Sequence, residues 1–73
     1  MAHTTHSARI TGPIPYVSHA GKAAHIPLGP CLVEELDDAH VDIVWGAKGE
    51  RSTLLPIEAL EAAEENGNLV LLD

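Results

Sequence analysis

The sequence predicts a mainly β protein with a single short helix near its C-terminal end. Residues 40–45 alternate between apolar and polar side chains with the period of a strand. Residues 56–66 begin with a proline, continue with alanines and glutamates, and lead into Gly67, which is typical of a helix and its end. A chain of 73 residues is long enough for one hydrophobic core and no more. Aromatic residues make up 3% of it, so this core must be aliphatic.

The first third of the chain is expected to be irregular. Its central run, Gly12-Pro13-Ile14-Pro15, follows neither the period of a strand nor that of a helix. Only residues 14–17 can form a short edge strand there, because a residue that precedes proline is driven into extended geometry. We therefore expect an irregular arm over residues 1–25 and a small β-barrel domain over residues 26–73.

The barrel domain is expected to begin with a strand over residues 31–36. The inward face of this strand is ambiguous, because Leu32 lies on one face, Cys31 and Val33 lie on the other, and each face also carries a glutamate. A bulge at Glu34-Glu35 would reconcile the two faces.

The second strand, over residues 40–45, has the clearest pattern. It places Val41, Ile43 and Trp45 on one face, and it follows a turn at residues 37–39 whose aspartates favour Asx turns. Two glycines then permit a tight loop before a third strand over residues 51–55. Together the three strands are expected to form an antiparallel meander.

The helix is expected to lie on the sheet as a lid, because its apolar stripe, at Ile57 and Leu60, is narrow. After Gly67 an apolar strand is expected over residues 69–72. Both faces of this last strand carry aliphatic side chains. One sheet and one helix do not easily cover both faces.

Self-association would cover the uncovered face of the last strand. Each aliphatic side chain removed from water in this way contributes roughly 1.5 to 3 kcal/mol. We therefore expect a homodimer or a contact with another protein. The alternative is that the N-terminal arm, through Ile10, Ile14 and Val17, folds over this face within one chain. Trp45 is either a hot spot of the interface or a half-buried core residue. The expected interface residues are Trp45, Leu69, Val70, Leu71 and Leu72.

The order of these elements resembles that of the SH3-like small barrels. The resemblance covers residues 28–73: an acidic turn, an alternating strand that ends in tryptophan, a glycine-containing loop, a proline-led helical turn and a final strand. It implies a barrel of about five strands and no particular function. Within this class, residues 53–61 are similar to the closing segment of the plasmid-type dihydrofolate reductases. Those enzymes carry a glutamine and a tyrosine where Thr53 and Leu55 stand here, so the resemblance does not extend to their binding residues.

Charge and composition narrow the partners that the sequence predicts. Four basic against eleven acidic side chains give a net charge of −7, which disfavours nucleic acid because a phosphate backbone would be repelled. No apolar run approaches the roughly 20 residues of a membrane-spanning helix, so no membrane contact is expected. The single cysteine, Cys31, has no partner for a disulfide within the chain. We expect a cytoplasmic protein.

Histidine is the one unusual feature of the composition, with five in 73 residues. Four of them lie in the expected arm, where they either form a solvated polar surface or gather around Zn, Ni or Cu, for which neutral imidazole is a common ligand. No other cofactor is expected. The candidate metal ligands are His3, His6, His19 and His25.

No complete catalytic constellation is visible in the sequence. His40 and Asp42 share the polar face of one strand, but the nearest nucleophile, Ser52, lies on the next strand, and such cross-strand polar pairs are common. The sequence therefore predicts a non-catalytic small β-barrel that acts through protein association, as a homodimer or as an accessory or regulatory subunit. Two alternatives stay open: a metal-binding or metal-trafficking protein, and a small oligomeric enzyme with its site between subunits.

Overall fold

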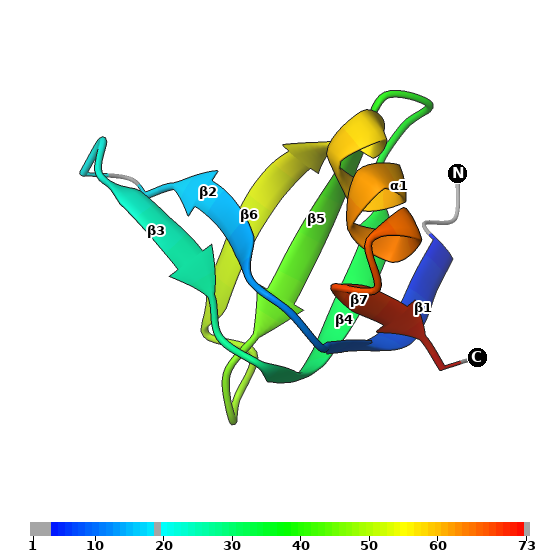
Figure 1. Ribbon diagram of the computed structural model, residues 1–73, viewed down its shortest axis with the longest axis horizontal. Coiled ribbons are helices and arrows are strands. Elements are labelled where there is room, and N and C mark those ends of the chain that lie inside the picture. Colours follow the sequence, from blue (N-terminus) through cyan, green and yellow to red (C-terminus); the bar gives the residue numbers. More distant parts are fainter. Residues whose placement is uncertain (1–3, 19, 73) are drawn as a thin grey trace.

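The computed structural model describes residues 4–18 and 20–72 and contains one helix and seven strands within them (Figure 1). Five strands form one antiparallel sheet in the order β6-β5-β4-β1-β7, and the hairpin β2-β3 forms a second sheet. The two sheets are not closed into a barrel by hydrogen bonds. The elements are β1 (Thr4–Ile10), β2 (Ile14–Val17), β3 (Ala23–Ile26), β4 (Gly29–Glu35), β5 (His40–Trp45), β6 (Arg51–Pro56), α1 (Ile57–Glu65) and β7 (Leu69–Leu71).

The expectation of an irregular arm over residues 1–25 is wrong, because β1, β2 and most of β3 lie within it. β1 is an interior strand of the larger sheet and pairs with β4 on one side and β7 on the other. Its inward side chains are His6, Ala8 and Ile10, of which Ala8 and Ile10 are buried. This set does alternate with period two, but it includes a polar and a small residue, so the apolar pattern is weak. The short strand over residues 14–17 is confirmed as β2, and its partner is β3.

The expected meander is confirmed as β4, β5 and β6. The pairing register of β4 is continuous on both of its sides, so the bulge expected at Glu34-Glu35 is absent. Cys31 and Val33 face the core, and Leu32 is 44% exposed on the opposite face. The alternation of β5 is confirmed, with Val41, Ile43 and Trp45 all buried.

The helix begins and ends close to where the sequence predicts. Pro56 has extended backbone angles and is the N-cap residue, one position before its expected place at the start of the helix. Gly67 has a φ of +75°, the left-handed conformation that lets the chain leave the helix at its end. Leu60 and Ala63 point into the core, so α1 is the expected lid. Among the described residues no helix is long and apolar enough to cross a membrane.

The core lies between the larger sheet and two covering elements. Helix α1 and the hairpin β2-β3 lie on the same side of the sheet (Figure 1), and they contribute Leu60, Ala63, Ile14 and Ile26 to one cluster with the inward side chains of the sheet. The opposite side of the sheet is the outer face, which neither element covers. Its side chains are Thr5, Ser7 and Arg9 from β1, Pro30, Leu32 and Glu34 from β4, His40, Asp42 and Val44 from β5, Ser52, Leu54 and Pro56 from β6, and Val70 and Leu72 at β7.

Candidate functional site

The structure separates the five residues of the predicted interface into two groups. Val70, Leu71 and Leu72 are 45%, 39% and 60% exposed at the edge of the sheet. Leu69 is 2% exposed and Trp45 is 8% exposed, and both belong to the core of their own chain. Leu69 and Trp45 therefore offer little surface to a partner, because α1 and the β2-β3 hairpin already cover the face into which they point.

An aliphatic row crosses the middle of the outer face. The register places Leu32 between Val44 on β5 and Ser7 on β1, and the N–H of Leu72 donates to the carbonyl oxygen of Ser7 at 2.8 Å. Leu32, Val44, Leu72 and the neighbouring Pro30 line a hollow of about 360 Å³, which the loop that contains Gly46 and Gly49 bounds at one end. The outer face therefore has both exposed apolar side chains and a shape into which a partner can fit.

Charges of opposite sign lie on the two sides of this aliphatic row. Arg9 lies in the next row of side chains, on the side of the β5-β6 loop, beside Pro30 and Val70. Glu34 and Asp42 lie opposite each other in the next row on the other side, which is the side of the β4-β5 turn. Burial, and then the nearby Glu34 carboxylate, raise the pKa of Asp42 above its ordinary value. A cation placed over this acidic pair would favour the ionised form of Asp42.

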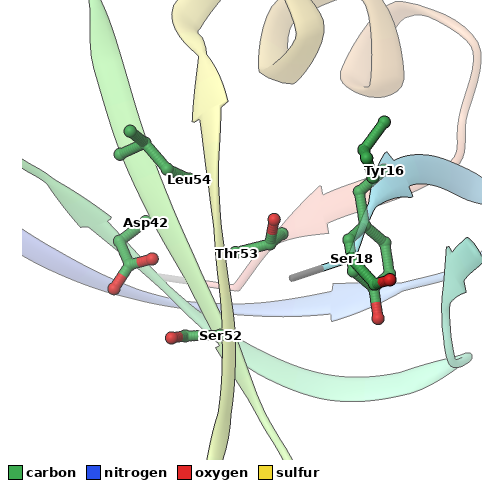
Figure 2. Close-up of a pocket in the computed structure, with 7 residues that line it drawn as sticks. Tyr16, Ser18, Asp42, Ser52, Thr53 and Leu54 are labelled. Carbon is green, nitrogen blue, oxygen red and sulfur yellow. The ribbon is translucent and has the colours of Figure 1, made fainter. Parts of the chain in front are cut away.

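A second groove runs along the free edge of β6. Its volume is about 360 Å³, and Tyr16, Val17 and Ser18 of the hairpin form its far wall. Figure 2 shows Asp42, Ser52 and Leu54 on one side of β6 and Thr53 on the other side, facing Tyr16 and Ser18. β6 is the last strand of the sheet on this side, so alternate backbone groups of the strand point into the groove.

The structure describes two of the four candidate metal ligands. His6 lies on β1, half-buried, and its Nε2 is 2.9 Å from the Glu35 carboxylate. His25 lies exposed on β3, in the other sheet. His3 and His19 lie outside the described residues. Within residues 4–18 and 20–72, no group of three or more histidine, cysteine or acidic side chains is arranged to hold a metal ion.

The polar pair considered for catalysis is not assembled. Asp37 rather than Asp42 contacts the imidazole of His40: its Oδ1 lies 3.3 Å from the Nδ1 of His40. The same Oδ1 accepts hydrogen bonds from the backbone N–H groups of Ala39 and His40, both at 2.7 Å. Ser52 pairs with Val44, four residues along β6 from the residue opposite His40. This arrangement is an Asx turn that orders the β4-β5 connection.

Cys31 is buried at the inward face of β4. Burial raises the pKa of its thiol, so little thiolate forms near neutral pH.

The fold and the site together define a small, mainly β domain with one uncovered sheet face. Comparison with protein-family models, with curated proteins and with solved structures finds no match to this chain.

Sequence reasoning missed most of the outer face. Arg9, Leu32, Val44 and Leu54 come from four different strands, and no local pattern connects them. The available signal was the ambiguous first strand of the meander, where placing Cys31 and Val33 inward leaves Leu32 outward.

Proposed function

We propose that this chain is a non-catalytic small β domain that works by protein association, and that the outer face is its contact surface. The proposal extends the predicted interface from β7 into the middle of the sheet. The observation that carries it is the hollow lined by Pro30, Leu32, Val44 and Leu72, in which the exposed Leu32 and Leu72 lie with the half-buried Val44. Exposed apolar patches of this kind mark interaction sites in small soluble proteins.

We also propose that the domain is of the SH3-like kind. The order of its elements supports this: a meander of β4, β5 and β6, a helix before the last strand, and a last strand that lies beside the first. That the two sheets together form a barrel is also proposed, because their hydrogen bonds alone leave them open.

The test of association is the mass of the chain in solution, measured by light scattering coupled to size exclusion over a range of concentrations. The wild type is expected to exceed the mass of one chain, and Leu72→Glu to return to it, because a buried carboxylate without a partner opposes contact. The matched control is Val17→Glu, since Val17 is 70% exposed and lies on β2, away from the outer face. A wild type with the mass of one chain at every concentration would rule out self-association.

A further inference from the structure

We infer that the occupant of the outer face is a second copy of this chain, turned so that Arg9 of each copy reaches Glu34 of the other. The inference rests on the proposed function and adds the partner and its orientation. It is carried by the arrangement of charge on the outer face and not by the apolar surface alone.

Three rows of side chains cross the outer face at right angles to the strands. The central row is aliphatic or small: Val44, Leu32, Ser7 and Leu72, with Ser52 at its end. The row on one side contains Arg9. The row on the other side contains Glu34 and Asp42. Successive residues on one face of a strand lie about 7 Å apart, so the cation and the acidic pair are about equally far from the central row.

This spacing makes the outer face complementary to itself under one symmetry operation. A two-fold axis that runs along the central row exchanges the two outer rows, so each aliphatic side chain faces the same row of the second copy. Arg9 then faces Thr5 of the second copy, in the row that also carries Glu34 and Asp42. Glu34 lies one strand to the side of that position, about 5 Å away, which the long arginine side chain can span. Both contacts form at once, because an isologous interface repeats each contact.

The alternative orientation is disfavoured by the same charges. A two-fold axis parallel to the strands would place the Arg9 row over itself and the acidic row over itself. Like charges that face each other across an interface oppose association strongly. The charge pattern therefore favours the axis along the central row over the axis parallel to the strands.

The size of the surface agrees with a modest dimer. Five strands about 4.8 Å apart and three rows about 7 Å apart give a footprint of roughly 24 by 20 Å. A stable standard interface buries about 800 Å² on each partner. The outer face lies below that figure, so we expect a weak dimer whose population depends on concentration.

The experiment is a charge-reversal cycle followed by sedimentation equilibrium of the full chain. Arg9→Glu places an acidic side chain near Glu34 of the second copy. Glu34→Arg places a basic side chain near Arg9 of the second copy. Each single change is expected to weaken dimerisation at least tenfold, and the double variant R9E/E34R to restore it to within about threefold of the wild type. Thermal unfolding monitored by circular dichroism confirms that each variant is folded.

Two controls match the change in net charge away from the outer face. Lys22→Glu, in the β2-β3 loop, matches Arg9→Glu, and Glu65→Arg, at the end of α1, matches Glu34→Arg. Both controls are expected to dimerise like the wild type.

The inference is supported if each single variant dimerises more weakly than the wild type and the double variant dimerises about as well as the wild type. Alternatively, the wild type forms a dimer that Leu72→Glu dissociates, while the charge-reversal variants dimerise like their controls. That result overturns the proposed orientation and still supports association through the outer face. If the wild type is monomeric at every concentration, a second copy does not occupy the outer face, and self-association is not the function of this chain.

Discussion

The ring of Tyr16 meets the indole of Trp45 edge to face, with centroids 5.5 Å apart and an angle of 68° between the ring planes. These are the only aromatic residues in the sequence. Tyr16 lies on β2 and Trp45 ends β5, so the contact joins the small sheet to the large one. Edge-to-face aromatic pairs contribute beyond the area they bury. The contact therefore helps to hold the β2-β3 hairpin on the sheet.

The first prediction follows from this contact. Tyr16→Leu is expected to lower the free energy of unfolding by about 1 to 2 kcal/mol, because it removes the ring contact and some buried area. It is also expected to shift the emission of Trp45, the single tryptophan, to longer wavelength as water reaches the indole. Tyr16→Phe keeps the ring and serves as the control. Unchanged emission and stability in Tyr16→Leu would show that other contacts hold the hairpin.

The second prediction concerns the close approach of Gly12 and Asn68. A Cβ at position 12 would overlap the Oδ1 of Asn68 and lie 2.8 Å from its Cγ, because the Asn68 side chain fills this space and its Nδ2 donates to the Pro13 carbonyl oxygen at 3.3 Å. Gly12→Ala is expected to cost about 1 kcal/mol of stability as that hydrogen bond is lost. In an Asn68→Gly background the same change is expected to cost less. Equal costs in the two backgrounds, measured by urea unfolding, would contradict the explanation.

The third prediction is a dependence of stability on pH through Asp37. The backbone N–H of Ala39, followed by the backbone and ring of His40, holds the pKa of Asp37 below its ordinary value of 3.8. A carboxylate with a lowered pKa in the folded state stabilises the fold above its unfolded pKa and loses that contribution as pH falls through the folded pKa. Asp37→Asn is therefore expected to lower the melting temperature at neutral pH, with the difference from wild type shrinking in acid.

Asp38→Asn, at the adjacent residue of the same turn, controls for the loss of one negative charge. A difference between wild type and Asp37→Asn that is constant from neutral pH to pH values well below 3.8 would argue against this role for the carboxylate.

The fourth prediction concerns Cys31. Because the thiol is buried and its pKa is raised, it is expected to react slowly with a disulfide reagent in the folded protein and rapidly in concentrated urea. The comparison is Leu28→Cys in a Cys31→Ala background, since Leu28 is 68% exposed. Similar rates at the two positions in the folded protein would mean that the Cys31 site opens readily.

The sequence was sufficient for those elements whose signals are local. The alternation of Val41, Ile43 and Trp45 is complete within one strand, and Pro56 and Gly67 mark the helix without reference to any other part of the chain. The terminal strand was predicted for the same reason, as a short apolar run after a helix end. Each of these elements can be identified from its own residues.

β1 was missed because its strand character depends on residues far away. His6, Ala8 and Ile10 form a weak apolar pattern, and the strand is held by pairing with β4 and β7 on its two sides. The burial of Leu69 was missed for a related reason. Which face of β7 is covered depends on where α1 and β1 lie, and the sequence does not contain that placement in any local pattern.

The pairing of β1 with β7 has a consequence for how the chain folds. Ala8 lies opposite Leu71, a separation of 63 residues, whereas the strands of the meander are neighbours along the chain. Closing a long loop costs more entropy than closing a short one, and contacts between distant residues form late. We therefore expect β4, β5, β6 and β1 to pair before β7 joins β1, which leaves one side of β1 unpaired in the interval. During that interval the nascent sheet is open to strands from other molecules, so dilute conditions should favour productive refolding.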